Sequence, residues 1–324
     1  MDQSTRIILI HRKTRLAELV ERFNTVQQVR FYLEQSAADF ADYQQEDKDY
    51  RHILEQARRT LDARGRVQVL ERAMLPSYRF NTDDTVIVIG QDGLVANTLK
   101  YLNGNPVIAI NPDSQRWDGV LLPFVPADLP LVIDEVLRRK RSHKEITLAR
   151  ASTNDGQTML AVNDLFIGPK SHTSARYALH WGERSEVQSS SGIIVSTGLG
   201  STGWYQSLLA MAQGITGTMT DPHVGSGFAW DAKMLMFTVR EPFPSKQTGT
   251  TLTRGEVNEL SPLRVESFMP ENGLIFSDGI DYFTGDGLPQ SGASFIQNYG
   301  DPSTADSFFN NFSQLYDNIN TAQL

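Results

Sequence analysis

The 324-residue chain contains no cysteine, which excludes disulfide bonds, iron–sulfur clusters, thiol nucleophiles and zinc sites built on cysteine. It also lacks any apolar run close to the ~18–20 residues that cross a bilayer as a helix. The first residues carry an acid at Asp2 and only a short apolar stretch, unlike a secretory signal or an arginine-rich transit peptide. These absences predict a cytoplasmic protein without a membrane partner.

Positive charge is also scarce. The formal net charge is −8 at pH 7, and no run rich in lysine and arginine is interleaved with aromatic residues. Such a surface repels phosphate backbones, so we expect no nucleic acid partner. The densest basic run, residues 138–144, is interpreted as the solvated end of a helix, where cations interact favourably with the helix dipole. An anion-binding patch is the alternative.

Histidine and the common nucleotide-binding loops offer little guidance. The six histidines form no His-x-x-x-His pair or other metal-ligand spacing, so no metal ligand can be assigned from the sequence. A complete Walker A loop is also absent, which removes the commonest kind of ATP site.

The first part of the chain alternates between predicted strands and helices. Residues 6–11, 85–89 and 107–110 are short apolar runs, typical of parallel strands that are covered on both faces. The helical spacing of apolar residues predicts helices over 14–35 and 94–102. This order predicts a doubly wound α/β domain over residues 1–126. Further predicted elements are a helix over 47–63, a strand over 66–70 and a helix over 134–141.

The character of the sequence changes after Pro123, Pro126 and Pro130. Apolar segments separated by turn signals such as Asp155-Gly156 follow, and they predict a β-rich domain over residues 127–302. The last residues, 303–324, begin with a helix N-cap residue and have helical apolar spacing, so we expect a closing helix there.

The segment Gly90-Gln91-Asp92-Gly93 lies between a predicted buried strand and a predicted helix. In an open α/β sheet, ligands bind beyond the carboxyl ends of the strands, and a helix N-terminus there favours a phosphate. A carboxylate is unusual where only phosphate is bound, so Asp92 is interpreted as a base for a hydroxyl proton or as a group reached through a metal ion. The alternative is an ordinary Asp N-cap in a tight turn.

A glycine-rich loop, GLGSTG (residues 198–203), follows a predicted strand at 193–197 and precedes a helix near Trp204. It has the letters of the dinucleotide fingerprint G-x-G-x-x-G, but a Rossmann site also needs a second strand that ends in an acid about 20 residues on. The stretch 214–227 contains no apolar strand, which argues against that interpretation. A Gly/Ser/Thr loop at a helix start still suits the hydroxyls of a ribose or a phosphate.

Asn163 and Asp164 are adjacent polar residues within the strand-like segment TMLAVNDLFIG. Polar groups inside an apolar run are costly to bury unless they are paired or used in a site. They are therefore candidate ligand-binding residues, and a solvated strand end is the alternative.

Taken in order, these segments resemble the NAD kinase family, and most closely its mitochondrial-type branch. The family's strand–Gly-Gly-Asp-Gly–helix motif is matched by VIVIGQDGLVANTLKYL, and its following strand with an asparagine by VIAINPDSQRWDGVLLPF. Its Asn-Glu strand is matched by VNDLFIG, and its Thr-x-Thr-Gly-Ser-Thr-Ala-Tyr loop by STGLGSTGWYQS. The segments RKTR, REPFPSK and FSDGIDYFTGDG also fall in the expected order, so the similarity covers nearly the whole chain.

The resemblance implies an NAD kinase/diacylglycerol kinase-like fold and the transfer of a phosphoryl group from ATP, with Mg²⁺, to the adenosine ribose 2′-hydroxyl of NAD. Asp92 would be the general base. NAD would lie between the two domains, helix 303–324 would return to the first domain, and a homo-oligomer, dimer or tetramer, would be expected. The residues implied to bind the dinucleotide or phosphates are Gly90, Gly93, Asn111, Asn163, Asp164, Ser191, Thr197, Gly200, Ser201, Thr202, Gly203 and Trp204.

The chain departs from the family's motifs at several positions. Gln91 and Leu94 stand where the family has glycine and threonine, which places a side chain at Gln91 where the resemblance implies that the donor phosphates bind. Asp164 replaces glutamate, and Ser191 stands where many members carry an aspartate. Two alternatives follow: a catalytically weak or inactive dinucleotide-binding protein on the same fold, and a kinase of the wider superfamily that acts on another hydroxyl.

Overall fold

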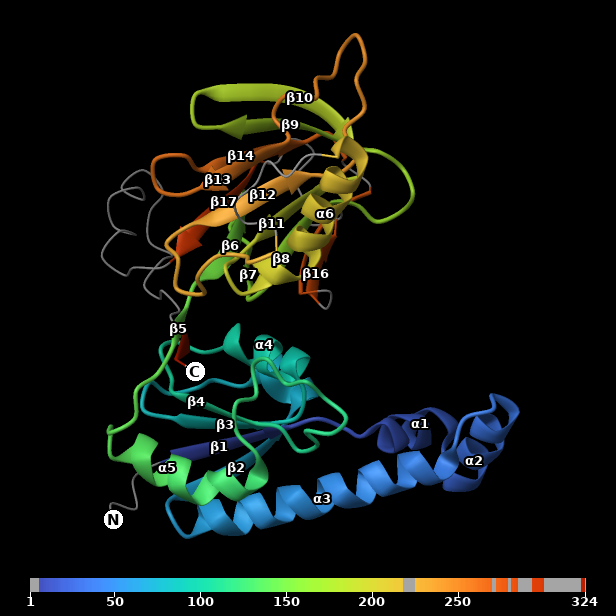
Figure 1. The fold of residues 1–324 in the computed structure, drawn as a ribbon, viewed down its shortest axis with the longest axis vertical. Helices are drawn as coiled ribbons and strands as arrows, with labels where there is room; N and C mark the ends of the chain where they lie inside the picture. The colour runs from blue at the N-terminus through green and yellow to red at the C-terminus, as the bar shows by residue number, and fades with distance from the viewer. Residues whose placement is uncertain are drawn as a thin grey trace. The chain divides into compact units, whose positions relative to one another are not determined.

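The computed structural model describes residues 6–217, 225–269, 272–278, 281–284, 293–299 and 322–323. The chain forms two compact units, Met1–His143 with Gln323–Leu324, and Lys144–Ala322. The first unit holds a parallel sheet with helices, and the second holds antiparallel sheets (Figure 1). The predicted fold class, an α/β domain joined to a β-rich domain, is confirmed.

The sheet of the first unit has four parallel strands, which are β1 (Arg6–His11), β2 (Arg66–Glu71), β3 (Thr85–Ile89) and β4 (Val107–Ile110). Their order is β2-β1-β3-β4. All of β3 and β4 and the middle of β1 are buried, as expected for continuous Val/Ile/Leu runs that are covered on both faces. The three strands predicted from such runs are confirmed.

The helices of the first unit are α1 (Arg15–Phe23), α2 (Val26–Gln35), α3 (Phe40–Asp62), α4 (Asp92–Leu99) and α5 (Leu129–Leu137), with 3-10 turns η1 (Arg72–Ser77) and η2 (Pro126–Asp128). Helices α3 and α5 lie on one face of the sheet and α4 lies on the other (Figure 1). Tyr50 and Leu61 of α3 share a buried cluster with Leu129 and Ile133 of α5 and with the strands. This cluster packs α3 and α5 against the sheet.

The single helix predicted over 14–35 was wrong, because the chain breaks it into α1 and α2 at Asn24. Asn24 adopts a left-handed conformation with φ 66°, which asparagine tolerates better than most residues. Thr25 then caps α2 by accepting a hydrogen bond from the Gln28 amide at 3.2 Å. Helix α3 also begins earlier than the predicted residue 47. Asp39 is its N-cap residue and accepts a hydrogen bond from the Ala41 amide at 2.8 Å.

The second unit is built from two six-stranded sheets whose strands all pair antiparallel. One has the order β10-β9-β14-β17-β6-β7 and the other β13-β12-β11-β8-β15-β16. The bounds are β5 (Glu145–Ile146), β6 (Leu148–Thr153), β7 (Thr158–Ala161), β8 (Asp164–Pro169), β9 (Ala175–Trp181), β10 (Arg184–Ser190), β11 (Ile193–Ser196), β12 (Leu235–Val239), β13 (Arg254–Val257), β14 (Leu263–Ser267), β15 (Gly273–Ser277), β16 (Asp281–Thr284) and β17 (Ala293–Tyr299).

The main core of the second unit joins side chains of both sheets, among them Tyr177 and Phe237, which are fully buried. Helix α6 (Trp204–Thr216), preceded by the 3-10 turn η3 (Gly200–Thr202), packs on the sheet that contains β11. Leu208 of α6 contacts a second buried cluster with Phe166 and Ile194. The sheet that carries β8 and β11 is therefore packed on both faces.

The predicted closing helix 303–324 lies outside the described residues, apart from Ala322–Gln323, which form the short strand β18. Within the part of the chain that the structure describes, no helix is long and apolar enough to cross a membrane.

Tyr50 ties α3 to the carboxyl ends of two strands. Its hydroxyl donates to the carbonyl of Ile89 at 2.6 Å and accepts from the amide of Arg12 at 3.2 Å. Burial raises the pKa of Tyr50 to about 12, so the hydroxyl keeps its proton and can donate. This contact fixes the point at which β3 ends and the following turn begins.

Replacing Tyr50 by phenylalanine should lower the free energy of unfolding by about 1–3 kcal/mol, because a buried carbonyl and an amide lose their partner. Urea unfolding followed by circular dichroism measures this change. The matched control is Tyr78→Phe, which removes an exposed hydroxyl contact with Gln68 and should change the free energy by less than about 0.5 kcal/mol. Equal losses in both variants would contradict the assignment.

Candidate functional site

The predicted site residues fall into two groups, one in each compact unit. Gly90, Asp92, Gly93 and Asn111 belong to the first unit. The second unit holds Asn163, Asp164, Ser191, Thr197, Gly200, Ser201, Thr202, Gly203 and Trp204. Each group is described within its own unit.

The turn after β3 has the predicted strand–turn–helix geometry. Gly90 follows β3, Gln91 is the N-cap residue of α4, and Asp92 and Gly93 open its first turn. A Cβ atom at Gly90 would lie 2.7 Å from the Cδ2 atom of Leu94, which is buried, so a larger residue there would require the end of the Leu94 side chain to shift. Leu94 thus fills space under the turn and does not face solvent.

The Asp92 side chain is not the ordinary N-cap that the sequence left open as an alternative. Its carboxylate accepts hydrogen bonds from the amides of Leu121 at 2.7 Å and Val120 at 3.2 Å, which belong to the loop after β4. Asp92 therefore reaches across from the end of β3 to the neighbouring strand's loop. A half-buried carboxylate held by two amides has a fixed direction, as a general base requires.

Asn111 organises the same loop from its other end. It is buried directly after β4, where its Oδ1 accepts from the Asp113 amide at 3.0 Å and its Nδ2 donates to the Trp117 carbonyl at 3.0 Å. The structure brings Asp92 and Asn111 together through this shared loop. The amide group of Asn111 is occupied by the loop's backbone.

Arg116 fastens this loop to α3, a role that the sequence did not reveal. Its guanidinium pairs with Asp42 at 2.5 Å and with Asp113 at 3.2 Å. Arg116, together with Arg15, lowers the pKa of Asp42 to about 2. The pairing joins residues far apart in the chain, so only the fold could reveal it.

In the second unit, the two polar motifs singled out from the sequence touch each other. The Thr197 hydroxyl donates to the Val162 carbonyl at 2.6 Å and accepts from the Gly200 amide at 3.1 Å, and the Thr197 amide donates to the Asn163 carbonyl at 2.9 Å. A Cβ atom at Gly200 would lie 2.2 Å from the Asn163 carbonyl oxygen, so this close approach requires glycine. The glycine-rich loop therefore packs directly on the Asn163-Asp164 turn.

The remaining residues of the glycine-rich loop divide into buried and exposed ones. The buried Ser201 hydroxyl donates to the Gly198 carbonyl at 2.6 Å and accepts from the Phe228 amide at 3.0 Å, so it holds the loop together. Thr202 and Gly203 are exposed at the start of α6. The predicted strand–loop–helix arrangement is confirmed, and these two residues are accessible to a ligand.

Trp204 and Ser191 lie away from the Thr197 end of β11. The Trp204 ring stacks on Phe166 with centroids 5.8 Å apart, and the guanidinium of Arg240 lies 5.5 Å from its centre. Ser191 precedes β11 and its amide donates to the Arg240 carbonyl at 2.9 Å. Ser191 is thus linked to Trp204 through Arg240, whereas Thr197 stands at the opposite end of the strand.

Asp164 has unusual electrostatics for a carboxylate. Burial, reinforced by the charge of Asp278 and opposed by a hydrogen bond from Ser196, raises the pKa of Asp164 to about 7. Its Oδ1 atom is buried and has no hydrogen-bond partner among the described residues, although the residue as a whole is partly exposed. A buried polar atom without a partner suits a carboxylate that receives a ligand hydroxyl.

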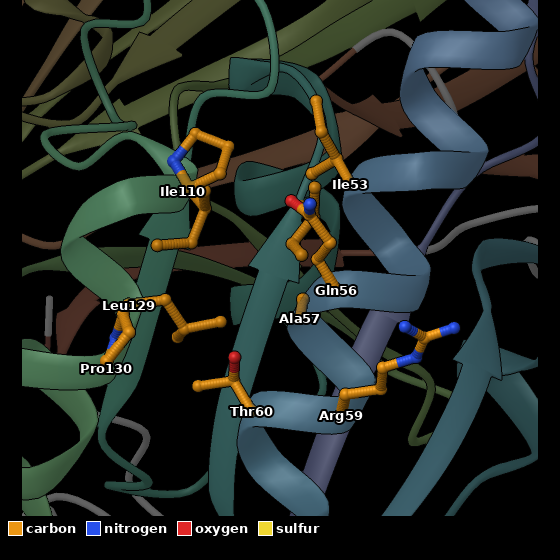
Figure 2. Close-up of a pocket in the computed structure, with 10 residues that line it drawn as sticks. Ile53, Gln56, Ala57, Arg59, Thr60, Ile110, Leu129 and Pro130 are labelled. Atoms are coloured by element: carbon orange, nitrogen blue, oxygen red, sulfur yellow. The ribbon is translucent and has the colours of Figure 1, made fainter.

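Two other features bear on what the protein can bind. Among the described residues, no group of three His, Asp or Glu side chains could hold a metal ion. A cavity of about 320 Å³ lies in the first unit between α3 and α5. Figure 2 shows residues of its walls, among them Ile53, Ala57 and Leu129. None of the predicted site residues lines this cavity, but its walls include Ile89 and Ile110, which directly precede Gly90 and Asn111.

Comparisons with known proteins identify the fold. No protein-family model matches the sequence, and no curated protein matches it. Among solved structures, an NAD kinase from Archaeoglobus fulgidus in complex with ATP aligns with a TM-score of 0.51 and 15% identity, covering 91% of this chain and 90% of the other. A yeast NADH kinase complexed with NADH aligns with a TM-score of 0.54 and 14% identity, covering 91% and 80%. The chain therefore has the fold of NAD and NADH kinases.

The raised pKa of Asp164 predicts a pH-dependent stability. Between about pH 4 and pH 7 the folded protein keeps a proton on Asp164 that the unfolded chain releases, so the free energy of unfolding falls as pH rises and levels off above about pH 7. Asp164→Asn should remove this component, which is on the order of a few kcal/mol. Urea unfolding of wild type and Asp164→Asn at about pH 4.5, 6 and 8, which span the titration of Asp164, measures this component.

Asp155→Asn is the matched control in the same unit. Burial favours a higher pKa for Asp155, but hydrogen bonds from Thr153 and Gln157 outweigh it and lower the pKa. Its contribution to stability is therefore present at neutral pH and is lost in acid, the opposite sign to Asp164. If the free energy of unfolding depends on pH in the same way for wild type and Asp164→Asn, the fold does not raise the pKa of Asp164.

Proposed function

We propose that the protein is an NAD kinase, which transfers the γ-phosphoryl group of ATP to the 2′-hydroxyl of the adenosine ribose of NAD and so forms NADP. The observation that carries the proposal is the direct contact between the Asn163-Asp164 turn and the Thr197–Gly200 segment. These are the two motifs for which the resemblance implies dinucleotide binding. The shared fold supports the same assignment.

In this proposal the second unit binds the dinucleotide. Asn163 and Asp164 receive the ribose hydroxyls, and the buried Oδ1 of Asp164 is a hydrogen-bond acceptor that the described residues leave unused. Thr197, Gly200 and Ser201 hold the loop in place, while the exposed Thr202 and Gly203 contact the ligand. Trp204 offers a flat ring next to the start of α6, and Ser191 supports Arg240 beside it.

The first unit supplies the base and the phosphate contact. The Asp92 carboxylate takes the proton of the 2′-hydroxyl as that oxygen forms its bond to the γ-phosphorus, and the bond from the γ-phosphorus to the bridging oxygen of ADP breaks. The exposed Gly93 leaves the N-terminal amides of α4 open to the donor's phosphates, and Gly90 lies just before this turn. Mg²⁺ enters with ATP as part of the substrate.

The main alternative is a dinucleotide-binding protein with weak or no kinase activity. Gln91 favours it, because its half-buried side chain stands at the N-cap of α4, where the donor phosphates would approach. A kinase for another hydroxyl substrate on the same fold is a further alternative. The homo-oligomer, the cytoplasmic location and the mitochondrial-type branch stay predictions from the sequence.

Asp92→Asn should abolish NADP formation while NAD affinity stays within about three-fold, because the base acts on the proton and contributes little to ground-state binding. The measurements are NADP formation with ATP and Mg²⁺, and NAD binding by calorimetry. The control is Asp83→Asn, an exposed acid just before the opposite end of β3, which should keep wild-type rates. Retained turnover in Asp92→Asn would refute the assignment of the base.

Gln91→Gly tests the donor site separately. Glycine removes a side chain beside the N-terminal amides of α4, so KM for ATP should stay the same or fall and NAD binding should not change. NADP formation at varied ATP concentration measures this. A wild-type protein that binds NAD without turnover, together with a Gln91→Gly variant that gains turnover, would favour the non-catalytic alternative for the natural chain. A large loss of activity on this substitution would show that Gln91 itself serves the donor.

A further inference from the structure

We infer that Asp278 is a positioning residue that fixes the Asn163-Asp164 turn for a ribose, an assignment that rests on the proposed function. Asp278 follows β15 and lies more than a hundred residues from that turn in the chain. It does not need to touch the dinucleotide. Its effect is exerted through the backbone that carries the two ribose-binding side chains.

The Asp278 carboxylate satisfies three consecutive backbone amides. Its Oδ1 accepts from Asn163 at 2.7 Å and from Asp164 at 3.2 Å, and its Oδ2 accepts from Val162 at 3.0 Å. Its own amide donates back to the Asp164 carbonyl at 3.1 Å. These charge-assisted bonds hold the main chain from the end of β7 to the first residue of β8.

The turn is held from two sides. The pairing of Ser277 with Leu165 places Asp278 beside the first residue of β8, and the Ser277 hydroxyl donates to the Leu160 carbonyl at 2.6 Å. On the other side the Thr197 amide donates to the Asn163 carbonyl at 2.9 Å. With its amide and its carbonyl both held, the two peptide units that flank Asn163 have fixed directions, and so has the Cα–Cβ bond of its side chain.

The backbone of Asp278 shows that this position is specialised. Its φ of 51° is left-handed, which costs free energy for a residue with a Cβ atom and which Asp and Asn tolerate better than most residues. Non-glycine residues keep such a conformation where the surroundings hold them in it. Here the four hydrogen bonds to the Val162–Asp164 segment are what hold it.

Asp278 also acts on Asp164 through its charge. Burial is the main cause of the raised pKa of Asp164, the negative charge of Asp278 adds to it, and the Ser196 hydroxyl opposes it. These are the groups that bear on Asp164 from the loop after β15 and from β11. Removing the charge at position 278 should therefore shift the titration of Asp164 to lower pH. A residue that only stabilised the fold would not produce this shift.

The test is steady-state kinetics and NAD calorimetry for wild type, Asp278→Asn and Asp278→Glu across pH. Asparagine keeps the shape but turns one acceptor into a donor and removes the charge, so KM for NAD should rise about tenfold with kcat within about two-fold. The pH at which NAD affinity changes should also move down. Glutamate keeps the charge but displaces the carboxylate, so KM should rise without this pH shift. Asp155→Asn, at the tip of the β6–β7 hairpin, is the control and should match wild type.

The outcomes separate this inference from the proposed function. Wild-type NAD affinity and pH profile in the folded Asp278 variants would overturn the role of Asp278 and leave the kinase proposal standing. A wild-type protein that neither binds nor phosphorylates NAD would overturn the proposed function and this assignment with it. If Asp278→Asn does not fold, Asp278→Glu decides the question, and an unchanged KM for NAD in that variant refutes the inference.

Discussion

The candidate site depends on one constraint, which is that backbone amides in the irregular segments between strands and helices must find acceptors. Buried N–H groups without a partner are costly, and they are rare in folded proteins. Here side-chain carboxylates meet this need twice. Asp92 accepts from the amides of Val120 and Leu121 in the first unit, and Asp278 accepts from three amides of the Val162–Asp164 segment in the second. Both acids thereby shape the irregular segments on which the other candidate residues lie.

Asp164 differs from Asp278 in how its oxygens are occupied, and that difference separates their proposed roles. Both oxygens of Asp278 are bound by amides, so this residue serves the backbone. Asp164 keeps a buried oxygen that the described residues do not use, and burial raises its pKa. A group that is desolvated and only partly satisfied gains most when a ligand supplies the missing hydrogen bond. Asp92 shares this occupancy with Asp278, because each of its oxygens accepts from an amide, and its proposed role as the base rests on its place in the turn between β3 and α4.

The sequence predicted local features well and long-range ones poorly. The run TVIVI predicted β3, and the glycines on either side of Asp92 and in GLGSTG predicted turns before α4 and α6, because these signals lie within a few residues. The break at Asn24 was missed since apolar spacing continues through it. The partners of Arg116 and Asp278 could not be predicted, because each lies far away in the chain and a single sequence carries no trace of that pairing. The contact between the Asn163 turn and Thr197 is of the same kind.

The fold is shared with kinases that are only 14% and 15% identical over most of the chain, which limits what the side chains can have kept in common. Core residues tolerate exchange among apolar types of similar volume, so they need not be identical. Close backbone approaches and buried amide acceptors are less tolerant. Gly200 cannot gain a Cβ atom beside the Asn163 carbonyl, and Asp278 can be replaced only by a residue that accepts from the same amides. In this chain the evidence for function therefore rests on such positions, and Gln91 is informative because it adds a side chain where the resemblance implies none.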